Sequence, residues 1–392
     1  MTILIKDTES FDVHAGEGFL VMVHDKHLVF KFTTDTVEVP FCLAPELEGA
    51  NVRDKIKLAV IGCGVWGQAH AEVFAHHPYG RLVAVADRQA SRARELGQQY
   101  SVPWYDDYRA MLEREECDAV GIATPDFAHA EPLLAAIAQG KHILCEKPLV
   151  TREDELELVH EAVLKSGCRV MVDFHNRWNP PFAITKQRLA SGELGTPVNG
   201  YLRLNDTIWV PLEYIPWASS SSIIWFLGSH AVDSLSWLFA DRVKRVYSVC
   251  HEGILKSRGV DTVDTYLTTL EFAQGGIAQI ENGWITPNTN PLVNDFKLNL
   301  LCTQGMVNMD LSSSNFYEVY SEKRIEHPDF FIKPRVHGVP TGFAYEAIRD
   351  FVNRLYRDEE FIAPYEESLT VNQVLFAILE SARKREPVAV RY

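Results

Sequence analysis

The feature that most constrains this chain is a glycine-rich turn between an apolar segment and a helix-forming segment. The run KLAVIG, residues 57–62, is apolar after its lysine, as in a strand buried on both faces of a sheet. Glycines at 62, 64 and 67 then form Gly-x-Gly-x-x-Gly, followed by QAHAEVFAHH with helical spacing. Asp87 ends the next apolar run, twenty residues after Gly67. This context predicts a dinucleotide-binding strand–turn–helix unit.

Each of these residues has a separate physical role in such a unit. Gly62 permits the tight turn, Gly64 lets the backbone approach a pyrophosphate, and Gly67 lets helix and strand pack closely. The phosphates lie at the positive end of the helix. Asp87 can accept hydrogen bonds from a ribose hydroxyl, which favours NAD, whereas the adjacent Arg88 leaves NADP as an open alternative.

The same alternation of segments continues to residue 178. Short apolar runs such as RLVAVAD, DAVGIAT, KHILCE and CRVMVDF alternate with helix-forming segments of about a dozen residues. This pattern predicts βαβ units and therefore an α/β Rossmann domain with a doubly wound parallel sheet over residues 56–178.

The two flanking regions have different patterns. Residues 179–392 contain one helical segment and then many strand-like runs, ending with FYEVYS, which predicts an α+β domain with a large, mostly antiparallel sheet. Two helical segments close the chain and are free to pack back on the Rossmann domain. Residues 1–55, rich in Val, Phe and Thr, predict a small β-rich N-terminal extension with two or three strands.

Composition narrows the partners and the compartment. The formal charge of −15 disfavours nucleic acid and anionic membranes as partners. We find no apolar run long enough for a transmembrane helix and no secretory signal pattern at the N-terminus. The seven cysteines are scattered without ligand spacing, which predicts reduced thiols in a cytoplasmic protein and no metal site.

A more specific set of motifs follows the glycine turn. Glu146-Lys147-Pro148 ends a predicted strand, where doubly wound sheets place their ligands. Thr124-Pro125 and His129 precede it, DFHNRWNPPF follows it, and LGSHAVDSLSWL has the pattern G-x-H-x-x-D. In this order the motifs resemble the Gfo/Idh/MocA family, named for glucose–fructose oxidoreductase and inositol dehydrogenase. The resemblance covers residues 56–391, and residues 1–55 have no counterpart in a typical member.

The resemblance implies hydride transfer between a hydroxyl of a sugar, sugar derivative or cyclitol and a nicotinamide cofactor. It also implies a homodimer or homotetramer and a peptide bond before Pro148 that is often cis. The implied substrate-binding residues are Arg177, Trp178, Asn179 and Asp206. The implied cofactor-binding residues are Gly62, Gly64, Val65, Trp66, Gly67, Asp87, Arg88, Thr124, Pro125, His129, Glu146 and Lys147.

Three residues are predicted to carry the chemistry. Lys147 is expected to polarise the reacting hydroxyl, because an ammonium lowers the pKa of a hydroxyl that it contacts. His230 is the candidate general acid/base, since histidine titrates near neutral pH. Asp233 lies three residues on, on the same helical face, and is expected to hold the imidazole or to contact substrate.

One position departs from the family pattern. The usual D-x-x-x-H has an aspartate four residues before the histidine, and here that position is Phe226. Either His230 acts without that carboxylate, or Asp206 or Asp173 replaces it, or the chain catalyses a different reaction. We therefore keep two alternatives: a redox-neutral enzyme with tightly bound NAD that acts on a glycoside by elimination or epimerisation, and a non-catalytic cofactor-sensing protein.

Aromatic residues are concentrated in one part of the second domain. Five of the eight tryptophans fall between residues 178 and 237, several beside WVPLEYIPWASSSS, a segment long enough to predict a lid or a subunit contact. Aromatic faces pack well against the C–H surfaces of sugars. The alternative is packing between domains or subunits, and the sequence favours neither.

Overall fold

The computed structural model describes residues 12–14, 19–24, 27–32, 36–40, 54–312 and 317–392. The chain divides into two compact units, residues 1–54 and residues 55–392. The first unit contains a four-stranded antiparallel sheet in the order β1-β2-β3-β4, one strand more than the upper number predicted. Its strands are β1 (Asp12–His14), β2 (Phe19–His24), β3 (His27–Phe32) and β4 (Thr36–Pro40).

The second unit begins with a six-stranded sheet, in which every recorded pairing is parallel and the order is β10-β9-β8-β5-β6-β7. The strands are β5 (Ile56–Ile61), β6 (Gly80–Ala86), β7 (Trp104–Tyr105), β8 (Ala119–Ile122), β9 (His142–Cys145) and β10 (Val170–Val172). The connecting helices are α1 (Val65–His76), α2 (Ala90–Tyr100), α3 (Tyr108–Arg114), η1 (Asp126–Ala128), α4 (Ala130–Ala138) and α5 (Glu153–Ser166).

This strand order predicts a ligand crevice between β5 and β8. The chain moves outward from β5 to β7 in one direction and from β8 to β10 in the other, so right-handed crossovers put the helices on opposite faces. In such doubly wound sheets, ligands bind beyond the carboxyl ends of the strands where the direction reverses. The predicted cofactor residues all follow these strand ends.

A mixed seven-stranded sheet forms the rest of the unit, in the order β16-β15-β11-β14-β13-β12-β21. The β11–β14 pairing is parallel and the other recorded pairings are antiparallel, which matches the predicted mostly antiparallel sheet. The strands are β11 (Pro197–Thr207), β12 (Val243–His251), β13 (Thr265–Phe272), β14 (Ile277–Thr286), β15 (Asn294–Cys302), β16 (Met306–Asp310) and β21 (Val388–Ala389).

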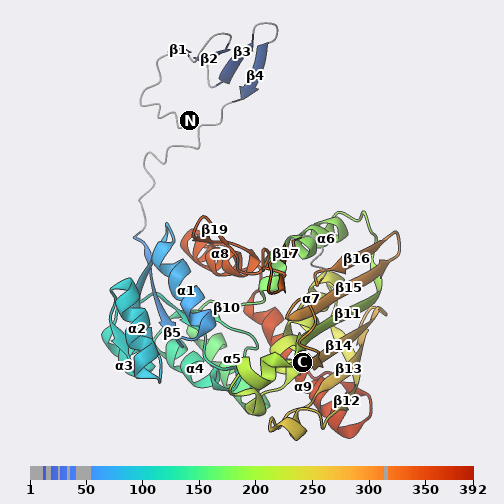
Figure 1. Ribbon diagram of the computed structural model, residues 1–392. Coiled ribbons are helices and arrows are strands. Elements are labelled where there is room, and N and C mark those ends of the chain that lie inside the picture. The colour runs from blue at the N-terminus through green and yellow to red at the C-terminus, as the bar shows by residue number, and fades with distance from the viewer. Residues whose placement is uncertain (1–11, 15–18, 25–26, 33–35, 41–53, 313–316) are drawn as a thin grey trace. The chain divides into compact units, whose positions relative to one another are not determined.

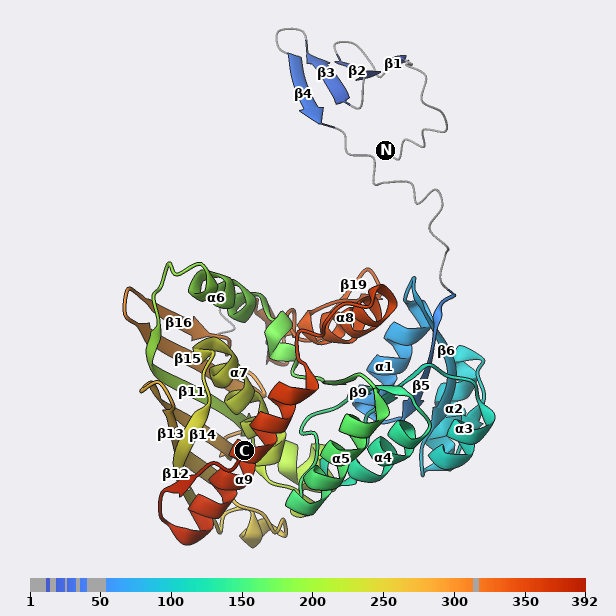
Figure 2. The same ribbon diagram turned by 180° about the vertical axis from the view of Figure 1, so that it is seen from behind.

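Helices cover one face of this mixed sheet, as Figure 2 shows for α7 and α9. Along β13, the buried residues alternate with more exposed ones, so the face that meets the helices carries the apolar core. The helical elements of this region are η2 (His175–Trp178), α6 (Pro180–Ala190), α7 (Ser229–Phe239), η6 (Lys256–Arg258), α8 (Phe343–Arg357) and α9 (Tyr365–Lys384).

The two C-terminal helices tie the mixed sheet to the parallel one. Helix α8 lies beside α1 (Figure 1), and the ring of Tyr356 stacks on that of Tyr79 with 4.4 Å between centroids. In α9, Asn372 accepts a hydrogen bond from the backbone N–H of Leu149 and donates one to the carbonyl of Val150. These contacts fix the backbone directly after Lys147-Pro148.

The segment WVPLEYIPWASSSS contains two helical turns, η3 (Val210–Tyr214) and η4 (Ala218–Ser220), and a third, η5 (Ile224–Gly228), follows it. Turns η3 and η5 are π-helical, whereas η4 is a 3₁₀ turn. The role of this segment as a lid or a subunit contact stays a prediction. Of the strand predicted at FYEVYS, Phe316 lies outside the described residues, and Val319–Tyr320 form the short strand β17, which pairs with β18 (Ile325–Glu326). A second small hairpin joins β19 (Arg335–Val336) to β20 (Val339–Pro340).

Among the residues that the structure describes, no helix is both long enough and apolar enough to cross a bilayer.

Candidate active site

The glycine turn between β5 and α1 has the geometry that a dinucleotide requires. Gly62 has φ +93°, and a Cβ on Gly67 would lie 1.7 Å from the Gly62 carbonyl oxygen, so both positions demand glycine. A Cβ on Gly64 would meet nothing within 4 Å, which leaves that side of the turn open. No side chain caps α1 and no acidic residue lies in its first turn. The helix therefore presents free N–H groups that fit a pyrophosphate.

Asp87 is fixed at the end of β6, beside this turn. Its carboxylate accepts hydrogen bonds from the backbone N–H groups of Cys63 and Gln89, each at 2.7 Å. A carboxylate has acceptor sites beyond these two, so Asp87 can still accept from ribose hydroxyls. Arg88 is exposed next to it, and Val65 is exposed on the first turn of α1. These residues fit the adenosine end of NAD.

The loop after β8 is held against the loop after β9 by His129. The two ring nitrogens of His129 contact the carbonyl oxygens of Pro148, at 2.7 Å, and Thr124, at 2.9 Å. The Lys147–Pro148 peptide bond is cis, as the resemblance implies. Pro125 begins η1 and is half-buried. The imidazole of His129 is thus occupied by the protein backbone and fixes the loops that flank Lys147.

Lys147 contacts Phe226, the residue at the position that departs from the family pattern. The Lys147 ammonium donates a hydrogen bond to the Phe226 carbonyl oxygen at 2.7 Å and lies 4.3 Å from the centroid of the Phe226 ring. Burial lowers the pKa of Lys147, opposed by the carboxylates of Glu146, Asp126 and Asp206. A carbonyl dipole and an aromatic face therefore hold the lysine where a carboxylate is the usual neighbour.

Asp206 supplies a carboxyl group close enough to interact with Lys147. The side chain is 1% exposed at the end of β11 and accepts a hydrogen bond from Asn294. Burial raises the pKa of Asp206 to about 7, although the Lys147 charge acts in the opposite direction. A carboxyl group that titrates near neutral pH can exchange a proton under physiological conditions.

His230 lies in the first turn of α7 and contacts a second histidine that the sequence motifs did not indicate. The ring centroids of His230 and His175 are 4.5 Å apart, and both side chains are buried. Burial, with the charges of His175 and Lys147, lowers the pKa of His230 well below its usual value, and burial lowers that of His175 to about 4. Trp66 stacks on His175 with 5.4 Å between centroids. Both imidazoles are therefore neutral at pH 7, with a free lone pair but a weaker basicity than an exposed histidine.

Arg177 of η2 and Asp233 of α7 pair with each other. The Arg177 guanidinium donates to Asp233 at 2.5 Å and to the carbonyl of Ile362 at 2.6 Å, and it also pairs with Glu367. Both members of the pair are buried. Burial raises the pKa of Asp233, opposed by the Arg177 charge. The donors of Arg177 thus have partners within the protein, and its contact with hydroxyl groups of the substrate stays a prediction.

A buried cluster of ionisable groups lies beside Lys147. His70 Nε2 is 3.3 Å from Glu146 Oε1 and 4.0 Å from Asp173 Oδ2. His70 packs on strand β8, where a Cβ on Gly121 would lie 2.5 Å from its Nδ1. Burial acts to raise the pKa of Glu146, but the contacts with His70 and Lys147 outweigh it, so the pKa of Glu146 is lowered overall. Burial raises the pKa of Asp173. These three groups can share a proton, and their donor atoms are also close enough to hold a cation.

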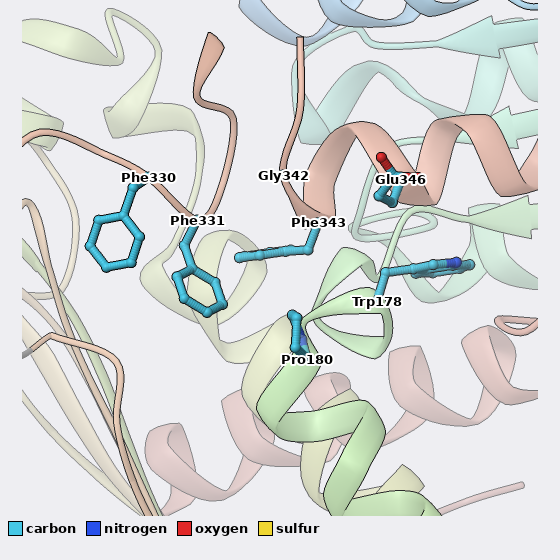
Figure 3. Close-up of a pocket in the computed structure, with 7 residues that line it drawn as sticks. All are labelled: Trp178, Pro180, Phe330, Phe331, Gly342, Phe343 and Glu346. Carbon is cyan, nitrogen blue, oxygen red and sulfur yellow. The ribbon is translucent and has the colours of Figure 1, made fainter. Parts of the chain in front are cut away.

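Trp178 and Asn179 lie at the junction between η2 and α6. Trp178 lines a cavity of about 270 Å³ with aromatic side chains from α8 and the segment that precedes it (Figure 3). Phe343 lines the same cavity, and its ring centroid is 5.4 Å from that of His175. Asn179 is buried at the start of α6. The structure therefore places Trp178 next to an apolar cavity beyond His175, and it places no other predicted site residue there.

Comparisons with known proteins agree with this geometry. Residues 56–174 match a family described as "Oxidoreductase family, NAD-binding Rossmann fold", and residues 182–308 match "GFO/IDH/MocA C-terminal domain". The chain is 25% identical over 342 residues to the uncharacterized oxidoreductase YrbE of Bacillus subtilis, covering 86% of this chain and 97% of that protein. It is 29% identical over 260 residues to the scyllo-inositol 2-dehydrogenase (NAD(+)) of Bacillus subtilis, covering 64% and 73%.

Solved structures share the fold. A scyllo-inositol dehydrogenase from Lactobacillus casei, with bound cofactor NAD(H) and scyllo-inositol, superimposes with a TM-score of 0.73 at 18% identity, covering 86% of this chain and 99% of that chain. GenD2 from gentamicin A biosynthesis, in complex with NAD, gives a TM-score of 0.74 at 22% identity, covering 86% and 97%. With both family matches, the glycine turn and the crevice that it borders, the chain belongs to the Gfo/Idh/MocA family of NAD-dependent oxidoreductases.

Proposed function

We propose that this protein is a dehydrogenase that transfers a hydride between NAD and a hydroxyl group of a sugar, a sugar derivative or a cyclitol. The observation that carries the proposal is the position of Lys147, which follows β9 beside the crevice. Its charge acts on the carboxyl group of Asp206 and on the imidazole of His230. The names of the inositol dehydrogenases that the chain resembles support a carbohydrate-like substrate.

Different side chains carry out proton transfer and charge stabilisation. NAD, when bound, accepts the hydride. Lys147, held by the Phe226 carbonyl, donates a hydrogen bond to the reacting hydroxyl and stabilises the alkoxide that develops. His230 is neutral and accepts the hydroxyl proton as general base. Asp206, with its pKa of about 7, provides the acidic group that Phe226 cannot provide.

Other predicted site residues position this machinery. Asp233 and Arg177 anchor α7, and with it His230, to η2 through their buried ion pair. His129 fixes the backbone on either side of the cofactor crevice. We assign these three residues a positioning role, because their polar atoms already have protein partners.

The exposed face of the mixed sheet supports a homodimer or homotetramer. Large apolar side chains from six strands remain exposed on it, which is unusual for a sheet surface that only water covers. They are Val198, Tyr247, Val249, Leu267, Ile277, Leu301 and Met306. We also infer a cytoplasmic location, because the six cysteines in the described residues are all free thiols.

Replacing Lys147 tests the proposed chemistry. Lys147→Met should reduce kcat by about 10²- to 10⁴-fold, because it removes the charge that stabilises the alkoxide. NAD binding, followed by quenching of tryptophan fluorescence, should stay within a few-fold of the wild type. Lys141→Met is the matched control, since Lys141 precedes the opposite end of β9 and donates to the Cys117 carbonyl. Unchanged turnover in Lys147→Met, or no binding of NAD(H) by the wild type, would refute the proposal.

The contact between Phe226 and Lys147 also supports a second candidate function. An altered proton-transfer set suits an enzyme that oxidises a glycoside, eliminates or epimerises, and returns the hydride to the same sugar. Such an enzyme keeps its NAD through purification and turns over a glycoside without net formation of NADH. Release of stoichiometric NADH with each turnover decides in favour of the dehydrogenase.

A further inference from the structure

A row of aromatic side chains leads outward from Lys147. The ring of Phe226, 4.3 Å below the ammonium, is 6.3 Å from the ring of Trp217 between centroids. Trp217 is in turn 6.1 Å from Phe127, whose side chain is 41% exposed. Behind Phe226, the buried ring of Trp284 lies at 5.8 Å. The planes of successive rings are inclined at 67° to 74°, the edge-to-face arrangement that aromatic pairs favour.

The row is held by contacts between the two sheets of the unit. Phe127 belongs to η1, after β8 of the parallel sheet, whereas Trp217 precedes η4 and Phe226 belongs to η5 in the mixed-sheet region. Asp126, beside Phe127, accepts a hydrogen bond from the Ser221 hydroxyl. The carbonyl of Ser221 accepts one from Thr262 at 2.9 Å. These bonds fix the spacing of the row independently of its own ring contacts.

Polarity changes along the row. Its inner end lies next to Lys147, Asp206 and His230, which can form hydrogen bonds with a hydroxyl group of the substrate or transfer its proton. Outward from Phe226, the rings of Trp217 and Phe127 offer apolar faces and one indole N–H, while both stay partly open to solvent. A free cyclitol or sugar has a hydroxyl group on nearly every carbon, so its polar edge matches the inner end and it offers the outer rings only its C–H faces. An aryl group matches the outer end, because aromatic edges and faces attract each other.

We propose that the substrate is a sugar that carries an aryl substituent, with the reacting hydroxyl at Lys147 and the aryl ring on Trp217 and Phe127. The proposal rests on the proposed function, since it places the sugar ring at the dehydrogenase site. Phe226 then has two roles: its carbonyl holds the lysine, and its ring begins the surface on which the substituent packs.

Matched glycosides test the proposal. The full-length protein, saturated with NAD, is assayed with methyl and phenyl glycosides of glucose, galactose and mannose, and with myo-inositol. At least one phenyl glycoside should have a kcat/KM about 10- to 100-fold above that of its methyl counterpart, the range expected from burying one aromatic ring. Equal values for every pair, or the highest kcat/KM with myo-inositol, overturn the proposal and leave the dehydrogenase assignment standing.

Variants then locate the effect. Phe127→Ala and Trp217→Ala should each raise KM for the preferred phenyl glycoside by about tenfold, with KM for its methyl counterpart within twofold of the wild type. Trp104→Ala is the matched control, since Trp104 is 41% exposed on β7 of the parallel sheet. Because Phe127 is exposed, its truncation should leave the fold intact. A uniform loss with both glycosides contradicts the proposal, whereas failure to bind NAD or any carbohydrate refutes the dehydrogenase function as well.

Discussion

At the scale of single residues, the environment of Lys147 differs most from the expected pattern. An ammonium that faces a carboxylate is strongly favoured in its charged form. Here a carbonyl oxygen and an aromatic ring contact it, while the adjacent Glu146 and, from other elements, Asp126 and Asp206 act on it electrostatically. Neither direct contact neutralises the ammonium, so its charge can stabilise a hydroxyl placed against it as an alkoxide.

The role of Asp206 can be tested by varying the pH, because its pKa of about 7 predicts an inflection in the pH–rate profile. If the ionised carboxylate assists proton removal, kcat/KM for alcohol oxidation should rise with pH up to about 7 and level off above it. Asp206→Asn should remove that inflection and lower kcat by about 10²-fold or more. A pH–rate profile of the wild type and the variant is the measurement.

The same residue predicts a change in stability. Because the folded carboxyl holds its proton to a higher pH than the unfolded one, its ionisation opposes folding. This cost is absent below pH 4, grows as the pH rises to about 7, and is constant above. Thermal unfolding should thus show Asp206→Asn gaining stability over the wild type at pH 8 but not at pH 4. An unchanged inflection with equal stability at both pH values would exclude Asp206 as the titrating group.

At the scale of elements, the ion pair between η2 and α7 determines where His230 lies. Arg177→Met leaves Asp233 buried without its ion-pair partner, which typically costs about 3–5 kcal/mol. Asp233→Leu leaves Arg177 paired with Glu367 alone. We therefore expect Arg177→Met to lower the free energy of unfolding by this order and Asp233→Leu to lower it by less, measured by urea denaturation. The double variant should be less destabilised than Arg177→Met, because it leaves no buried unpaired charge and Glu367 is half exposed.

The kinetic part of this experiment separates position from catalysis. If Asp233 only positions α7, the double variant that folds should keep the pH–rate profile of the wild type. If Asp233 instead takes part directly in catalysis, the folded double variant should lose one of the inflections of the pH–rate profile.

At the scale of the whole molecule, the mixed sheet has one face covered by helices and one face with exposed apolar side chains. Leu267, 55% exposed on β13, pairs with Val249 on β12 across this face. If subunits associate here, Leu267→Arg should place a charge in the interface and dissociate the oligomer. Sedimentation equilibrium would measure the mass. The control is Leu164→Arg on α5, which is 71% exposed and lies on the parallel-sheet side, and it should not change the mass.

The sequence alone was sufficient to predict both sheets, the glycine turn and the acidic end of β6. These features follow from short-range rules: continuous apolar runs make strands buried on both faces, and three glycines at fixed spacing make a turn that few other functions require. The lysine at the end of β9 follows from the same reasoning, because the carboxyl ends of parallel strands border the crevice.

Only the tertiary structure decided which polar groups meet. Arg177 and Asp233 are 56 residues apart and Lys147 and Phe226 are 79 apart, so no local pattern could reveal either contact. The same holds for His175, which the fold brings against His230, and for the aromatic row, whose members come from different elements. The physical reason is that periodicity determines which face of an element is buried, whereas the partner of a buried polar group depends on how distant elements pack.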